Sequence, residues 1–356
     1  MTMRYKILTI LFGLLVGCTA MYPNTQGTQE GAIDVKEIIF GHIGNSYEWH
    51  ITHIGDMDLS IPLPVIVYSN EQGWKCFLSS EFKKAENGEY QGFYISQSAE
   101  NEGKVCERIN GREVRPVLDI SITKNVMQLW IVVALMLIVF LSCARWYRSK
   151  KPGDAAPKGF VGLIEMFVMM VNDEIIKSCI GEKHYRPYAP YLLTVFFFIF
   201  FSNILGLVPI FPGGANLTGN ITVTFFLAMG TFLLINLSGN KTYWKEILWP
   251  DVPLLLKFPI PLMPVIEIFG IFTKPLSLMI RLFANILAGH AMVLSLTCII
   301  FITFQVGAVI GTTLSTVSVF MMIFMDFLEL LVAFIQACVF TLLSSVFIGL
   351  AHQEEE

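Results

Sequence analysis

Long apolar runs, separated by short polar segments, fill the chain from residue 125 onward. The first covers about 125–145, and the next two cover about 188–208 and 221–238. Each is close to the roughly 20 residues that an α-helix needs to cross the hydrocarbon core of a bilayer. The pattern therefore predicts helices that cross a membrane.

Two longer apolar runs follow, over about 262–304 and 314–350, with a turn rich in Gly and Thr between them. A helix of about 40 residues is about 60 Å long, twice the apolar thickness of a bilayer. Such helices must tilt, bend or run partly along the membrane surface. We predict a long tilted helical hairpin, which completes an all-α membrane domain (residues 125–356) of about five membrane-embedded helices.

Between the first two spans, Gly159 to Ile180 mixes apolar and polar positions. A set of apolar residues recurs at spacings of three and four, which indicates one helical face: Phe160, Leu163, Phe167, Met170 and Val171. We predict an amphipathic helix at the membrane interface. The alternative is a partly inserted helix that packs on the other spans.

The chain before residue 125 has a different pattern. Residues 1–18 combine a positively charged start with a short apolar core, which is typical of a signal peptide. The run that ends at Cys18 also resembles a bacterial lipoprotein cleavage box, so lipidation and ordinary cleavage both remain open. Residues 19–124 contain short β-like runs between turn residues, which predicts a small exported β-rich region. Its Cys76 and Cys106 either form a disulfide or stay free.

Positive charges set the expected orientation. Arg145, Arg148 and Lys150 follow the first span, and Lys241 and Lys245 follow the third. Because Lys and Arg are enriched in cytoplasmic loops, these loops are expected inside. We therefore predict a multi-pass protein of the bacterial inner membrane, with the N-terminal region in the periplasm and the C-terminus in the cytoplasm.

Composition agrees with a membrane protein. The 356 residues are 54% hydrophobic and only 15% charged, whereas a soluble domain has about 25% charged residues. The net charge of −4 gives no indication of a nucleic-acid partner. The seven cysteines form no CxxC pair, and the chain has no GxxxxGK[ST] loop. We expect neither a metal nor another cofactor.

Polar and ionisable side chains are few in the predicted hairpin, and their spacing sorts them into faces. They are Glu267, Lys274, Ser277, Arg281, Asn285 and His290 in the first arm, and Asp326, Glu329 and Gln336 in the second. At about 100° per residue, Ser277, Arg281 and Asn285 share a stripe, whereas His290 points to nearly the opposite face. Glu329 and Gln336 lie on one face of the second arm.

Arg281 is the costliest of these side chains. A charge at the centre of a bilayer costs about 2.5–3.5 kcal/mol on insertion scales, so it needs water or a counter-charge. His290 is a side chain that changes charge near neutral pH, and a nearby carboxylate favours its protonated form. The set therefore indicates a proton relay in which Arg281 is a fixed electrostatic gate. A buried Arg–carboxylate pair that only locks the hairpin is the alternative.

Sequence motifs in the two arms resemble those of a known family. TKPLSLMIRLFANILAGH at 273–290 and ELLVAFIQA at 329–337 closely resemble the paired signatures of subunit a of the F-type ATP synthase. The resemblance covers about 125–350. It implies a stationary proton-channel subunit that binds no nucleotide and offers two half-channels to the carboxylates of a c-ring. The implied partners are that c-ring, the b-subunit stator, the rest of the ATP synthase and membrane lipid.

The resemblance also implies roles for single residues. Arg281 matches the arginine that faces the c-ring, releases protons from its carboxylates and prevents a short circuit between the half-channels. Ser277 and Asn285 match polar positions along the aqueous path, and Gln336 matches a polar partner close to the arginine.

His290 and Glu329 match a channel-lining pair that some members carry in exchanged order. Glu267 and Lys274 also match family positions, and Asp326 is a further candidate. The family pattern does not explain the exported N-terminal region, and it leaves the coupling ion, H⁺ or Na⁺, open. A secondary transporter is disfavoured because the halves show no convincing repeat. An envelope scaffold would leave the cost of an intramembrane arginine unexplained.

Overall fold

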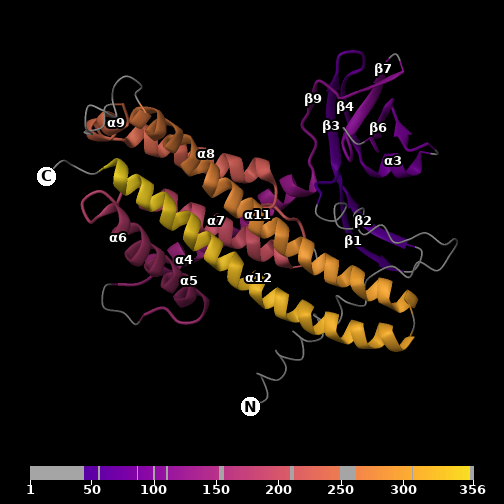
Figure 1. Cartoon of the computed structure of the whole chain (residues 1–356). Helices are drawn as coiled ribbons and strands as arrows, with labels where there is room; N and C mark the ends of the chain where they lie inside the picture. Colours follow the sequence, from indigo (N-terminus) through magenta and orange to yellow (C-terminus); the bar gives the residue numbers. More distant parts are fainter. Residues whose placement is uncertain are drawn as a thin grey trace. The chain divides into compact units, whose positions relative to one another are not determined.

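Strands dominate the chain before residue 124, and helices dominate after it (Figure 1). The computed structural model describes residues 44–54, 57–85, 87–98, 101–109, 111–151, 156–208, 212–248, 262–306 and 308–352. The predicted signal peptide lies outside these residues. Two units are distinguished by their internal contacts: residues 1–130 with 208–215, and residues 131–207 with 216–356.

The N-terminal unit contains three antiparallel sheets in its described residues. β1 (Glu48–Ile54) pairs with β2 (Met57–Pro62), and β3 (Pro64–Ser69) lies between β4 (Gly73–Leu78) and β9 (Leu118–Asp119). The third sheet is formed in order by β5 (Glu89–Tyr90), β6 (Phe93–Ile95), β7 (Val105–Ile109) and β8 (Arg112–Val114). The helix α3 (Ser80–Lys84) follows β4. A β-rich N-terminal region is thus confirmed.

Alternation along β3 explains how this unit builds its core. Every second side chain of the strand is buried, and Val65 and Val67 lie in a cluster with Phe77, Phe82 and Phe93. Because side chains of a strand alternate between its two faces, this sheet presents one face to the core and the other outward.

Cys76 and Cys106 of this unit are free thiols. Cys76 is exposed on β4, whereas Cys106 is buried on β7. Burial raises the pKa of the Cys106 thiol to about 11, and Glu113 adds to this increase. Of the two alternatives, the structure therefore shows free thiols and not a disulfide.

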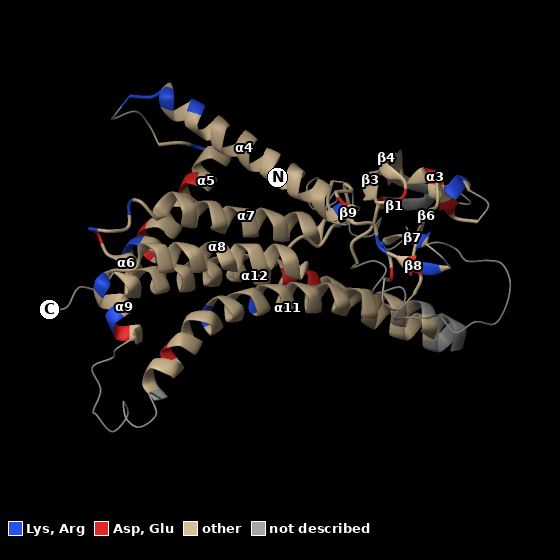
Figure 2. Cartoon of the chain, turned by 90° about the horizontal axis from the view of Figure 1, so that it is seen from above, with Lys and Arg blue, Asp and Glu red and all other residues tan. Residues whose placement is uncertain are grey.

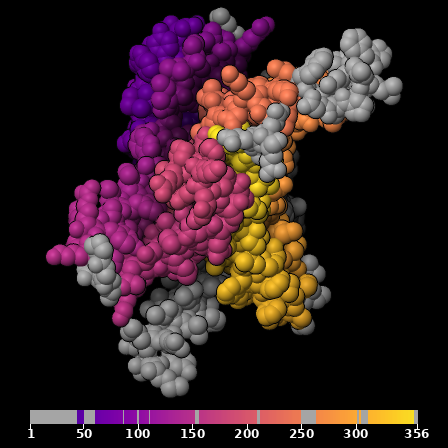
Figure 3. Space-filling view, turned by 90° about the vertical axis from the view of Figure 1, so that its left-hand side faces the viewer, coloured from indigo at the N-terminus to yellow at the C-terminus, as the bar shows by residue number. Residues whose placement is uncertain are grey.

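Five helices are long and apolar enough to cross a membrane, which confirms a mostly helical membrane protein. They are α4 (Lys124–Arg148), α7 (Ala189–Leu207), α8 (Ile221–Ser238), α11 (Leu262–Val306) and α12 (Ala308–Ala351). In the helical unit, α12 packs against α11 and α7, and α8 packs against α11. Figure 3 shows α12 in yellow beside the pink surface of the preceding helices.

The two longest helices contain 45 and 44 residues, so each is roughly 67 Å long at 1.5 Å per residue. Pro275 lies inside α11 and removes a helical hydrogen bond, and Figure 2 shows that this helix is curved. The tilt of the two helices relative to a bilayer stays a prediction.

The segment between the first two spans contains an element that the sequence pattern does not predict. It is divided into α5 (Phe160–Met169), a π-helix η1 (Met170–Ile176) and α6 (Lys177–Ile180). Phe160 and Leu163 are exposed, whereas Val171 is buried, so the predicted apolar face is divided between outside and core. Its η1 part packs on α7 and α12. A position at the membrane interface stays a prediction for this segment and for α9 (Lys241–Leu248).

Candidate functional site

One side of α11 is packed and another is open, and the predicted polar stripe lies on the open side. Leu278, Leu282 and Ile286 are buried in the core of the helical unit. The residues directly before each of them, namely Ser277, Arg281 and Asn285, are exposed. Since residues four apart share a helical face, the two sets form parallel stripes along α11.

No carboxylate of the described residues forms an ion pair with Arg281. A pair that locks α11 to α12 through Arg281 is therefore absent from the part of the chain that the structure describes. A guanidinium is charged at all physiological pH values, so this group is a permanent cation on the open face of α11.

His290 lies on the packed side of the same helix and meets a carboxylate from α12. Its Nδ1 is 2.6 Å from Oε1 of Glu329, and the glutamate is only 7% exposed. Its Nε2 is 3.4 Å from the backbone oxygen of Gly206 at the end of α7. Three helices therefore meet at this imidazole.

The contacts of the imidazole restrict its protons. The oxygen of Gly206 is only an acceptor, so Nε2 must carry a hydrogen to donate to it. Nδ1 of His290 lies within ion-pair distance of Oε1 of Glu329, but the contact does not have the geometry of a hydrogen bond. His290 and Glu329 thus form a close acid–base contact, in which Nε2 carries a hydrogen towards Gly206.

Gly289 makes the close approach of Glu329 possible. A Cβ atom at this position would lie 2.9 Å from Oε1 of Glu329, closer than real side chains allow. The glycine that precedes His290 therefore admits the carboxylate to the surface of α11. Among the described residues, neither His290 Nδ1 nor Glu329 Oε1 has a hydrogen-bond partner.

A second buried polar group lies one turn from Gly206 on α7. Asn203 donates a hydrogen bond of 3.2 Å to the backbone oxygen of Ala333 in α12, and accepts one of 2.6 Å from the hydroxyl of Thr218. Asn203 and Thr218 are almost fully buried. The sequence pattern does not single out Asn203, Gly206 or Gly289. An amide side chain in an otherwise apolar helix is nevertheless a signal that points to Asn203.

The remaining predicted residues are distributed along the two long helices. Gln336 is buried on α12, two turns after Glu329, and Asp326 is half-buried one turn before it. Glu267 is half-buried near the start of α11.

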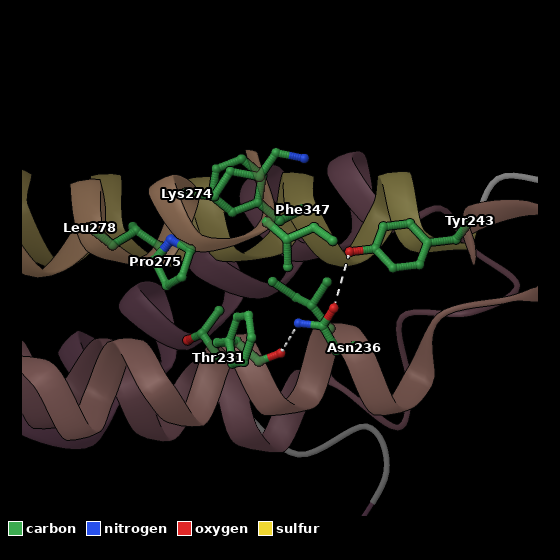
Figure 4. Close-up of a pocket in the computed structure, with 10 residues that line it drawn as sticks. Thr231, Asn236, Tyr243, Lys274, Pro275, Leu278 and Phe347 are labelled. Carbon is green, nitrogen blue, oxygen red and sulfur yellow. Dashed lines mark hydrogen bonds between the residues drawn. The ribbon is translucent and has the colours of Figure 1, made fainter. Parts of the chain in front are cut away.

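Lys274 lines a small pocket between α8, α9, α11 and α12, with its amino nitrogen 5.5 Å from the centre of the Phe347 ring (Figure 4). In that pocket Tyr243 donates a hydrogen bond of 3.4 Å to Asn236. Of the ionisable candidates, the structure pairs His290 with Glu329 and leaves Lys274 in a separate environment.

Comparisons with known proteins cover both parts of the chain. A family model described as ATP synthase A chain matches residues 126–349, and a domain of unknown function (DUF8433) matches residues 38–120. The chain is 46% identical to ATP synthase subunit a of Chlorobium phaeobacteroides, over 67% of each protein. It is 44% identical to that of Pelodictyon phaeoclathratiforme, over 67% of this chain and 69% of the relative. The family match spans all five apolar helices, and this chain is a member of the ATP synthase A chain family.

Proposed function

We propose that this chain is the stationary proton-channel subunit of a rotary F-type ATP synthase, with two half-channels that serve the carboxylates of a c-ring. One observation carries the proposal beyond membership of the family. The permanent cation Arg281 lies on the open face of α11 without a carboxylate partner in the described residues, while the His290–Glu329 ion pair lies on the packed side. A gate and a relay thus occupy different sides of one helix.

Arg281 acts as the gate through its charge. When a c-ring carboxylate passes, two opposite charges at about 4 Å attract each other by about 4 kcal/mol at the effective dielectric of a protein. An adjacent guanidinium lowers the pKa of a carboxyl group by about 1–3 units, so the carboxyl group releases its proton. The same positive charge repels protons and keeps the two half-channels separate.

His290 and Glu329 act as the relay in one half-channel. In this role the imidazole and the carboxylate, whose nearest atoms lie 2.6 Å apart, pass a proton from one to the other. A potential of about 100 mV supplies roughly 2.3 kcal/mol for each proton that moves, so several protons must pass for each ATP. Ser277, Asn285 and Gln336 line the paths, and Asp326, Glu267 and Lys274 are further candidates.

The same proposal includes partners and orientation. The open face of α11 fits a c-ring, and the rest of the stator, including the b-subunit, holds the chain in place. The charged ends Arg145 and Arg148 of α4 favour a cytoplasmic C-terminus and a periplasmic N-terminal region in the bacterial inner membrane. Nucleotides bind elsewhere in the complex.

The test is Arg281→Ala in the intact complex, assayed in inverted membrane vesicles. ATP-driven proton uptake should fall below detection, and assembly of the complex, measured by immunoblot after purification, should be unchanged. Ile280→Ala is the matched control, since Ile280 is an exposed apolar neighbour on the same helix. Full coupled pumping in Arg281→Ala would refute the proposed gate.

A further inference from the structure

One face of the β4-β3-β9 sheet contains no charged residue. The register of the strands gives nine positions on this face, in three rows. The rows are Trp74–Tyr68–Leu118, Cys76–Ile66–Ile120 and Leu78–Pro64–Ile122. The third row extends beyond β9, because the amide of Ile122 still donates a hydrogen bond to the oxygen of Pro64.

This face is not the core of the unit. The core is formed by the opposite face, with Val65, Val67 and Phe77, and α3 and β6 lie on that side of the sheet (Figure 1). Trp74 is 60% exposed, Ile120 54% and Leu78 48%. The outer face of an antiparallel sheet that contacts water is normally polar. Nine uncharged and mostly apolar positions therefore indicate a face that contacts an apolar medium.

The connection to α4 identifies that medium. The amide of Lys124, the first residue of α4, donates to the oxygen of Ser46, and the amide of Asn125 donates to the side chain of Asn45. The sheet therefore continues into an apolar, membrane-length helix without a flexible linker. Only Thr123 separates Ile122 from Lys124, so the two are at most about 7 Å apart.

We infer that the Trp74–Tyr68–Leu118 face lies against the lipid leaflet at the N-terminal end of α4, and that the N-terminal unit is a membrane-surface domain. Trp and Tyr are enriched at the level of the lipid headgroups, which fits the row of Trp74 and Tyr68. A second tryptophan, Trp130, is 55% exposed on α4. It lies about 9 Å along the helix from Lys124, at a depth suited to the same interface.

The dimensions of the face restrict how the sheet is inclined to the membrane. Rows two residues apart are separated by about 6.6 Å, so the three rows span about 13 Å. The headgroup layer on one side of a bilayer is about 5–8 Å thick. The strands must therefore incline towards the membrane plane, so that the face of the sheet, and not only its lower edge, contacts lipid.

Cys76 provides a natural probe, because it is exposed in the middle row. The experiment uses the full chain in its complex, reconstituted in lipid nanodiscs, with the other cysteines replaced by alanine and a nitroxide spin label on Cys76. Electron paramagnetic resonance compares collisions with oxygen, which concentrates in lipid, and with a water-soluble nickel chelate. A second sample carries the label at Trp74→Cys with Cys76→Ala, and a control carries it at Glu89→Cys, an exposed position on β5.

We expect oxygen to dominate at Cys76 and at Trp74→Cys, and nickel to dominate at Glu89→Cys. Nickel access at Cys76 equal to that of the control would place the face in water and overturn the inference. Protection of Cys76 from both reagents would show a protein partner on the face and would overturn it as well. If Trp74→Cys does not assemble, the label on the native Cys76 still decides the question.

Discussion

The strands of the N-terminal unit and the long helices of the chain differ in how their buried polar side chains are satisfied. In the N-terminal unit, Tyr47 donates a hydrogen bond of 2.6 Å to Asp119, and Ser69 donates one of 2.6 Å to the buried Glu107. In the helical unit, Ser202 and Ser344 have buried hydroxyl oxygens without a hydrogen-bond partner among the described residues. Nδ1 of His290 on α11 and Oε1 of Glu329 on α12 also lack a hydrogen-bond partner among the described residues.

Under the proposed function, this difference separates polar groups that stabilise a fold from polar groups that take part in proton transfer. A closed hydrogen bond contributes about 0.5–1.5 kcal/mol to stability, whereas an unsatisfied buried group costs about 1–3 kcal/mol. A protein retains the second kind where water or a moving proton supplies the missing partner. Substitutions in the N-terminal cluster should therefore change stability alone, and substitutions at the α11–α12 junction should change proton flux alone.

After the loss of the Arg281 charge, the next largest effect is expected at the His290–Glu329 pair. His290→Ala and Glu329→Ala each remove one of the two groups of the proposed relay, so ATP-driven proton uptake should fall at least about tenfold, equivalent to ~1.4 kcal/mol. Assembly of the complex should change little. Fluorescence quenching of a pH-sensitive dye in inverted vesicles measures the uptake, and Met292→Ala, at an exposed position on α11, is the matched control.

The exchange of the two residues sharpens this test. The double variant His290→Glu with Glu329→His restores an imidazole and a carboxylate at the same junction. It should recover uptake to within about threefold of the native protein, or ~0.7 kcal/mol. If both single variants pump normally, the pair is not on the proton path, and the contrast between the units fails.

The sequence pattern predicts those features of the site that are fixed within a single helix. Periodicity along α11 separates Arg281 from His290, because the angle between residues is fixed by the helix itself. It does not predict that Asn203 bonds to α12 or that Gly206 accepts from His290, because these contacts depend on how separate helices pack. The sequence pattern does not predict the π-helix η1 either, and this element packs against α7 and α12.

A smaller effect is expected from Gly289→Ala. The added methyl group would lie 2.9 Å from Oε1 of Glu329, and the end of this flexible side chain can move away at modest cost. Proton uptake should fall about threefold, or ~0.7 kcal/mol. Glu329→Asp shortens the acidic side chain by one methylene and so makes room for the added methyl group. The double variant Gly289→Ala with Glu329→Asp should therefore pump better than Gly289→Ala alone. A double variant that is worse than either single variant would contradict this steric account.

The smallest effect on proton flux is expected from Tyr47→Phe, which should leave proton uptake unchanged. The variant should instead lower the free energy of unfolding of the N-terminal unit by about 1–3 kcal/mol. The variant removes the hydroxyl that donates to Oδ2 of Asp119, while Oδ1 still accepts from the amide of Ser121. Hydrogen exchange of the β3 amides in the assembled complex measures this local stability. A loss of uptake without a loss of protection would show that the polar groups of the two units do not differ in kind.

The same variant has a distinct pH dependence. Burial raises the pKa of Tyr47 above its ordinary value near 10, and the hydrogen bond to Asp119 raises it further. Below about pH 10 the hydroxyl keeps its proton in both the folded and the unfolded state, so its contribution to stability is complete. Above that pH the unfolded state loses the proton and the folded state does not, so stability falls with rising pH by up to about 1.4 kcal/mol per unit. Tyr47→Phe lacks this proton, and its stability should therefore decline less steeply than that of the native protein between about pH 10 and 11. Equal slopes for the two proteins would mean that the Tyr47–Asp119 bond does not hold the proton in the folded unit.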